Sequence, residues 1–131
     1  MKNINIYLVI LLGFGALITA CKKEHEHTNE STITIANPLA GTIYNQGDTV
    51  FINATITAAE AMHGWEIKLK NKTADVEVFS DEEHAHAATY SIAGYWVNNV
   101  TADSDMELEI TATIDHDGNT ANKKVDFHCH Q

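Results

Sequence analysis

From Ser31 onward, apolar and polar residues alternate with a period of two along most of the chain. In one such run, Met106, Leu108 and Ile110 are separated by single polar residues. A period of two places successive side chains on opposite faces of an extended strand, so that one face enters the core. Runs of this kind recur at 32–36, 49–57, 64–70, 73–79, 87–97, 105–115 and 120–130. Because no run has a convincing helical period, the pattern predicts an all-β fold.

Turn-forming residues separate these runs. Asn37-Pro38, Gln46-Gly47-Asp48 and Asp117-Gly118-Asn119 are typical strand breaks, and we expect Asn71-Lys72 to join two strands in a tight hairpin. About seven short strands with turns every 8–12 residues favour an antiparallel immunoglobulin-like β-sandwich. The stretch "NPLAGTIYNQGDTVFINATI" at 37–56 resembles the opening of bacterial Ig-like domains, and "ITATIDHDGNT" at 110–120 resembles their penultimate strand. This resemblance implies a fold and carries no catalytic motif.

The N-terminal residues follow a different pattern. Lys2 precedes an apolar run at 4–20, which is typical of a secretory signal peptide. The alternative is an uncleaved single-pass anchor, for which the run is of marginal length. Ile18-Thr19-Ala20-Cys21 resembles the lipobox of bacterial lipoproteins, which implies cleavage before Cys21 and lipidation of that cysteine. Lys22-Lys23-Glu24 loosely resembles the signals that send some Bacteroidetes lipoproteins to the cell surface, so a periplasmic and a surface location both stay open.

We therefore expect three segments: a signal peptide at 1–20, a lipidated cysteine with a flexible tether at 21–30, and one sandwich domain at 31–131. The tether "KKEHEHTNE" is polar and has no period, as linkers do. The lipid would attach the protein to the outer membrane of a bacterial cell envelope. With Cys21 lipidated, Cys129 has no partner for an intramolecular disulfide.

The net charge and the lack of arginine limit the classes of partner that the domain can bind. The chain of 131 residues has a formal net charge of −10 and contains no arginine. Phosphate contacts dominate the affinity of proteins for nucleic acid, so we expect no nucleic acid partner. The negative charge is compatible with cation binding, and it is also an ordinary means of staying soluble.

Four of the eight histidines are expected to meet. In an Ig-like topology, the connections that contain His63, the pair His84 and His86, and His116 lie at one end of the sandwich. If the strands extend as far as these residues, parity predicts that all four side chains point inward at the mouth of the core. Imidazole is the commonest metal ligand, and zinc and copper both accept four nitrogens. We therefore predict one divalent ion at this end, zinc or copper; the alternative is a set of solvated surface histidines.

A second group lies near the C-terminus. Alternation places Cys129 inward, and His128 and His130 outward, where Glu107 and Glu109 are expected beside them. A surface His-His-Glu metal site is one interpretation, and a solvated terminus is the other.

Two further histidines, His25 and His27, lie in the tether, where a charged linker is the preferred interpretation. Together with the lipobox, the histidines make the chain resemble the His-rich Ig-like lipoproteins of Bacteroidetes. We predict a lipid-anchored metal-binding protein that acts as a carrier, sensor or scavenger and not as an enzyme. The alternative is a non-catalytic Ig-like accessory subunit of an outer-membrane complex, bound to another envelope protein. Convergence of the four histidines discriminates between the two.

Overall fold

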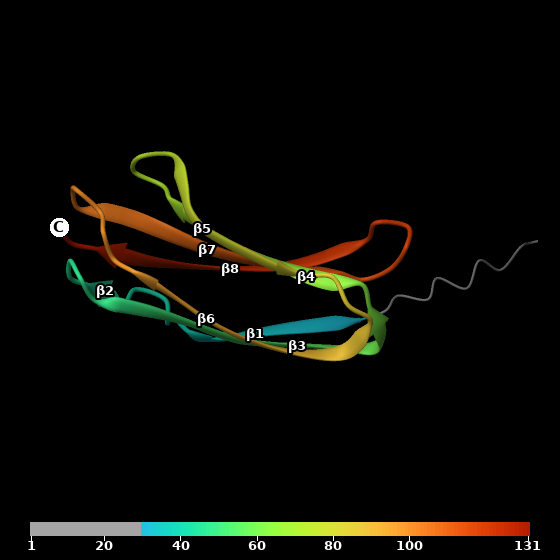
Figure 1. The fold of residues 1–131 in the computed structure, drawn as a ribbon. Helices are drawn as coiled ribbons and strands as arrows, with labels where there is room; N and C mark the ends of the chain where they lie inside the picture. The colour runs from blue at the N-terminus through green and yellow to red at the C-terminus, as the bar shows by residue number, and fades with distance from the viewer. Residues whose placement is uncertain (1–29) are drawn as a thin grey trace, which may run out of the picture.

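The computed structural model describes residues 30–131, so Cys21, His25, His27 and the predicted signal peptide lie outside the described residues. Eight strands form two packed layers (Figure 1). They are β1 (Ser31–Asn37), β2 (Ile43–Tyr44), β3 (Thr49–Met62), β4 (Gly64–Asn71), β5 (Val76–Glu83), β6 (Ala87–Val97), β7 (Ser104–Thr113) and β8 (Thr120–Cys129). Residues 30–131 contain no helix that is long and apolar enough to span a membrane.

One sheet has the strand order β1-β3-β6, and the other has the order β2-β8-β7-β4-β5. All pairs are antiparallel except β2 with β8. The predicted all-β, immunoglobulin-like sandwich is therefore confirmed, with one strand more than expected. That strand, β2, has two residues, which is too short for any period to reveal.

The core is built from the alternating residues of both sheets. Ile52 and Ile56 of β3 face Ile67 of β4 and Leu108 and Ile110 of β7, and all five are fully buried. The predicted inward position of Cys129 is confirmed, because this residue is also fully buried. Burial of each large aliphatic side chain stabilises the fold by about 1.5–3 kcal/mol relative to exposure.

The β4–β5 connection differs from the expected tight hairpin. Strand β5 begins at Val76, after a four-residue turn at 72–75. The Asn71 side chain accepts a hydrogen bond of 2.9 Å from the Ala74 backbone N–H, and Asp75 has a φ of 55°. An asparagine that bonds the backbone ahead of it favours a longer turn over a two-residue one.

Two of the chain crossings between the sheets, β3–β4 and β5–β6, lie at the same end of the sandwich. His63 alone separates β3 from β4, and the segment 84–86 separates β5 from β6. Tyr90 contacts both crossings. Its hydroxyl donates to the Ala85 carbonyl oxygen and lies 3.4 Å from the Met62 carbonyl oxygen. The fold thereby brings two short histidine-bearing segments side by side (Figure 1).

Candidate metal centre

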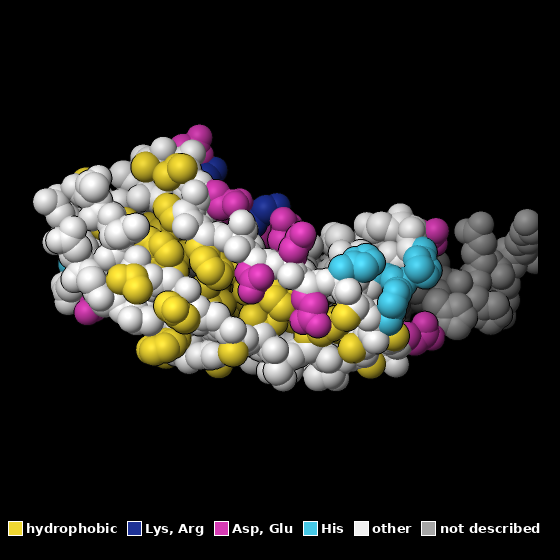
Figure 2. All heavy atoms as spheres, viewed as in Figure 1, with side chains coloured by type: hydrophobic (Ala, Val, Ile, Leu, Met, Phe, Trp, Pro, Cys, Tyr) yellow, Lys and Arg dark blue, Asp and Glu magenta, His cyan; other side chains and the backbone are white. Residues whose placement is uncertain are grey.

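Four imidazoles gather at the end of the sandwich where the β3–β4 and β5–β6 connections cross between the sheets. We call His63, His84, His86 and His116 the end cluster. His63 and the pair His84 and His86 occupy the two crossings, and His116 lies in the β7–β8 turn. Figure 2 shows histidine side chains forming one surface patch at this end. The predicted convergence of these residues on one end is therefore present in the structure.

Three of the four rings are mutually adjacent. The centroid of the His63 ring lies 3.8 Å from that of His116 and 4.5 Å from that of His86, and His86 and His116 are 6.2 Å apart. His84 joins this trio through His86, at 6.1 Å. Around a tetrahedral ion with metal–nitrogen bonds of 2.0–2.1 Å, ring centroids lie about 5 Å apart. The observed separations bracket that value.

The orientation of the rings is not that of a closed site. His63 and His86 pack edge to face, with an interplanar angle of 88°, and His63 and His116 are tilted by 52°. Within residues 30–131, the ligand atoms that converge within 4.8 Å of one another belong to a different group, described below. Rotation of the exposed rings about χ1 and χ2 is needed to direct the nitrogens of the end cluster at one point.

Backbone contacts fix the position of each segment. The His63 N–H donates to the Thr113 carbonyl oxygen at 2.8 Å, which holds His63 against the end of β7. Gly64 has a φ of 136°, and a Cβ there would overlap the Glu83 carbonyl oxygen and lie 3.1 Å from the His84 Cα. The glycine therefore lets the two crossings approach more closely than any side chain would allow.

The β7–β8 turn is held by a carboxylate. Asp115 Oδ1 accepts hydrogen bonds from the backbone N–H groups of Asp117 and Asn119, at 2.9 and 3.1 Å. Its Oδ2 accepts from the Asn119 side chain at 2.7 Å. These bonds lower the pKa of Asp115 below its usual range, so the carboxylate is ionised at neutral pH. The predicted turn at 117–119 is confirmed, and Asp115 fixes the loop that carries His116.

The predicted inward orientation of the four side chains is wrong. His63 is half-buried, and His84, His86 and His116 are exposed. Strand parity predicts orientation only while the chain stays extended and paired. Strand β5 ends at Glu83 and β7 ends at Thr113, both before the histidines that follow them, and β3 has a register shift between Thr57 and Met62. The end cluster therefore lies on the surface beside the core.

The surroundings of His63 favour its neutral form. Partial burial lowers the pKa of His63 below 6.5, and the neighbouring imidazoles of His116, His86 and His84 lower it further, while Asp115 acts in the opposite direction. A neutral imidazole is the form that coordinates metals. An open depression of about 450 Å³ adjoins the ring, and its lining includes Glu66, Glu82, Glu83 and His84. Carboxylates thus surround the cluster on one side.

The second histidine pair also acquires carboxylate neighbours, but not the expected ones. His128 Nδ1 lies 2.9 Å from Asp105 Oδ1, and His130 Nδ1 lies 3.1 Å from Asp103 Oδ2. The expectation of Glu107 and Glu109 beside this pair is wrong, because the β7–β8 register places Asp105 opposite His128.

The two glutamates instead form ion pairs with Lys124, at 2.9 and 3.4 Å. Sequence reasoning missed Asp103 and Asp105 because alternation does not fix the register across the hairpin. Counting back from the Asp117-Gly118-Asn119 turn with Thr113 paired to Thr120 would have found both.

Comparisons with known proteins leave the function open. No family model matches the chain, and no curated protein matches it. Among solved structures, the fibronectin(III)-like modules of Clostridium thermocellum CbhA are similar, at 17% sequence identity and a TM-score of 0.49. That match covers 76% of this chain and 96% of the module. The sandwich itself is of the immunoglobulin-like type by its two strand orders, β1-β3-β6 and β2-β8-β7-β4-β5.

Proposed function

We propose that this chain is a lipid-anchored metal-binding protein of the bacterial cell envelope, and that the end cluster holds one zinc or copper ion. The observation that carries the proposal is the adjacency of the His63, His86 and His116 rings, which come from three separate connections. The three ring centroids lie within 6.2 Å of one another, and each ring carries a nitrogen that can coordinate a metal. The proposed role is that of a carrier, sensor or scavenger without catalysis.

Electrostatics supports the same assignment. Burial and the other imidazoles hold the pKa of His63 below its usual value, so this ligand is already deprotonated near neutral pH. Metal affinity depends on deprotonated ligands, and a site that keeps its imidazole neutral loses less affinity to competing protons. Asp115, ionised and adjacent to His63, supplies negative charge that favours a bound cation.

Thermal unfolding with and without metal tests the proposal. The unfolded chain does not preassemble ligands from three connections, so an ion that binds the end cluster should stabilise the folded state. At a hundredfold excess over Kd, the free energy of unfolding should rise by about 2.7 kcal/mol. We expect His84→Ala with His86→Ala to remove most of this gain with zinc or copper. A full gain in that double variant would exclude the end cluster as the site.

The alternative is a non-catalytic interaction module, and one feature of the surface favours it. Phe51 and Tyr95 lie opposite each other on β3 and β6, and their side chains are 57% and 64% exposed. Val97, 45% exposed, follows on the same face of β6. Exposed aromatic groups of this kind are typical of protein contact surfaces. If neither zinc nor copper stabilises the domain, this interaction module becomes the preferred function.

A further inference from the structure

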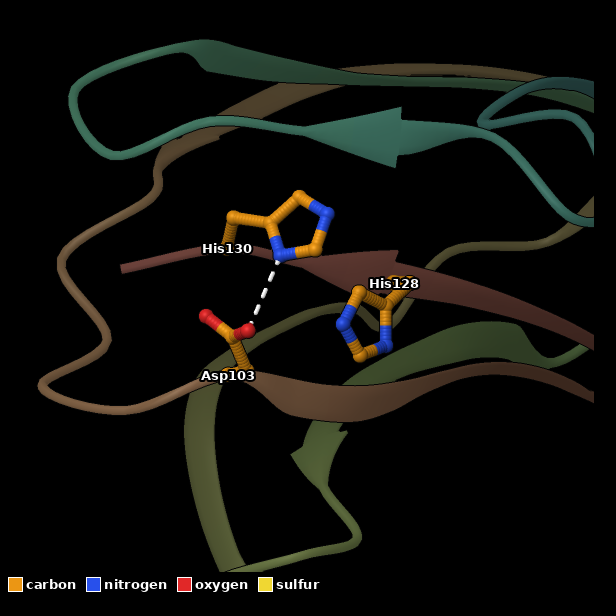
Figure 3. Close-up of side chains that lie close together, drawn as sticks. All are labelled: Asp103, His128 and His130. Carbon is orange, nitrogen blue, oxygen red and sulfur yellow. Dashed lines mark ion pairs between the residues drawn. The ribbon is translucent and has the colours of Figure 1, made fainter.

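The C-terminal end of β8 forms a second polar cluster at the opposite end of the sandwich from the end cluster. His128 and His130 alternate with the buried Cys129, so both rings emerge on the same outer face. Asp103, which precedes β7, lies beside them. We call Asp103, His128 and His130 the terminal cluster; Figure 3 shows the three side chains around a common space between the ends of β7 and β8.

The donor atoms of this cluster are already close to coordinating positions. One ligand atom from each of Asp103, His128 and His130 lies within 4.8 Å of the other two. The His130 Nδ1 and Asp103 Oδ2 atoms are 3.1 Å apart. Donor atoms around a tetrahedral zinc ion lie about 3.3 Å apart, given bonds of 2.0–2.1 Å. Small side-chain rotations would therefore suffice for all three to coordinate one ion.

The backbone that carries the two rings is held on several sides. The N–H groups of His128 and His130 donate to the carbonyl oxygens of Thr42 and Tyr44, at 2.9 and 2.8 Å. The His130 carbonyl oxygen accepts from the Asn98 side chain at 2.9 Å. These bonds, together with the pairing of β8 to β7, fix the spacing of the two imidazoles. The terminal cluster therefore lies at the paired ends of β7 and β8, where the backbone of both histidines is hydrogen-bonded.

Asp105 orients the His128 ring. Its Oδ1 lies 2.9 Å from His128 Nδ1, so Nε2 is the ring nitrogen that remains for a metal. A carboxylate bonded to the distal nitrogen of a ligating imidazole fixes the ring and raises its basicity. Asp105 is itself positioned, because its backbone N–H donates to Thr73 Oγ1 at 2.9 Å. It is a positioning residue and not a ligand in this arrangement.

Asp103 supplies the one carboxylate of the terminal cluster. Its Oδ1 accepts a hydrogen bond of 3.0 Å from the Gln131 N–H. This bond occupies Oδ1, and the Oδ2 atom beside His130 Nδ1 is available as the oxygen ligand.

We propose that Asp103, His128 and His130 form a second divalent-metal site, of the two-histidine, one-carboxylate type, with Asp105 holding the His128 ring. Three protein donors leave at least one coordination position for water or for a donor from another molecule. The mixed nitrogen and oxygen donors suit first-row divalent ions such as Zn²⁺ and Co²⁺. This site is independent of the one proposed at the end cluster.

Titration of the metal-free chain with Zn²⁺, followed by calorimetry, tests both sites at once. We expect two ions per chain. The variant His128→Gln with His130→Gln should lose one ion, and His84→Gln with His86→Gln should lose the other. All three proteins are compared with and without His25→Gln and His27→Gln, so that the tether does not contribute to the count.

The possible outcomes separate the two proposals. If the parent chain binds one ion only and the His128/His130 variant keeps it, the terminal site is overturned and the end cluster is supported. If the parent chain binds one ion only and the His84/His86 variant keeps it, the terminal site is supported and the end cluster is overturned. Two ions in the His128/His130 variant, or none in the parent chain, also overturn the terminal site.

Single substitutions then test the assigned roles. Asp103→Asn should weaken Zn²⁺ at the terminal site about tenfold or more, and Asp105→Asn should do the same through the ring it holds. Asp126→Asn on β8 is the matched control. It also removes one carboxylate charge, but from a residue that pairs with Lys72 and not with the terminal cluster, so it should leave the affinity unchanged. Equal loss in all three variants would mean a general charge effect and would contradict the assigned roles.

A measurement on the unsubstituted chain covers the case of a variant that fails to fold. Paramagnetic Co²⁺ should broaden or shift the imidazole NMR signals of His128 and His130 at one equivalent per site, with absorption bands of a nitrogen- and oxygen-bound ion. Signals of both rings that stay unchanged with Co²⁺ in excess would overturn the terminal site.

Discussion

The imidazole rings of His63 and His116 lie 3.8 Å apart between centroids, although one follows β3 and the other lies in the β7–β8 turn. Protonation of either ring therefore places a charge beside the other. Burial and this proximity together hold the pKa of His63 below 6.5 in the folded state, while the unfolded chain keeps an ordinary value.

A pH dependence of stability follows from that difference. Between the lowered folded pKa and about 6.5, the unfolded chain binds more protons at His63 than the folded chain does, so the free energy of unfolding should fall as pH drops through this window. Urea unfolding of metal-free protein at a series of pH values measures the slope. His63→Gln should flatten it. An equal slope in that variant would show that His63 titrates normally.

Because the β3–β4 and β5–β6 connections lie so close together, a side chain at position 64 should destabilise the fold. Gly64→Ala adds a Cβ that overlaps the Glu83 carbonyl oxygen at a φ of 136°, and we expect a loss of about 3 kcal/mol or more from the free energy of unfolding. Gly118→Ala is the matched control, because Gly118 also has a positive φ, of 86°, but nothing lies within 4 Å of the added atom. It should cost about 1 kcal/mol. Similar losses in both variants would remove the argument for close approach.

The sequence predicted the sandwich well and the histidine orientations poorly, for one physical reason. Alternation reports which face of a strand is buried, so Ile52, Ile67 and Leu108 could be assigned to the core in advance. The topology also placed the four histidines at one end. Orientation beyond a strand end depends on turn geometry, which alternation does not record. His86 and His116 lie beyond such ends, and the parity argument failed there.

The pairing register of β7 and β8 was the second feature that the sequence pattern could not predict. The acidic partners of His128 and His130 depend on which residues of β7 face β8, and a shift of two residues keeps every side chain on its face. Glu107 and Asp105 are therefore indistinguishable by pattern alone. The β7–β8 pairing, in which Thr113 faces Thr120, decides between them.

The thiol of Cys129 should be protected in the folded protein. It is fully buried, and burial raises its pKa to about 11, so the reactive thiolate is scarce at neutral pH. In a Cys21→Ser chain, which leaves Cys129 as the single thiol, we expect slow labelling by a thiol reagent under native conditions and rapid labelling in denaturant. Fast native labelling would mean that β8 opens at its end, and it would weaken the case for an ordered terminal cluster.

Membrane attachment is expected to depend on Cys21. Because Ile18-Thr19-Ala20-Cys21 resembles a lipobox, Cys21→Ala should yield protein without lipid and outside the membrane fraction. Mass spectrometry of the N-terminal peptide and cell fractionation measure these outcomes. Membrane retention of the variant with an intact N-terminus would instead support the uncleaved anchor.

Asp115 should influence metal binding at the end cluster without being required as a ligand. Its two carboxylate oxygens hold the turn that carries His116, through the backbone N–H groups of Asp117 and Asn119 and the Asn119 side chain. Asp115→Ala releases that turn and removes the negative charge that favours a cation beside His63. By both routes, we expect Zn²⁺ affinity at the end cluster to fall about tenfold or more, as for other residues that orient ligands.

The control for that experiment is Asp117→Ala, which removes an exposed carboxylate from the same turn but leaves the hydrogen bonds accepted by Asp115 in place. It should change the affinity little. If the two variants lose affinity equally, general charge and not turn geometry governs the site. If neither loses affinity, His116 is not a ligand, because the loop that positions it has then been loosened without consequence. Ring NMR signals of His116 that move in Asp115→Ala and stay in place in Asp117→Ala would confirm that the turn itself was altered.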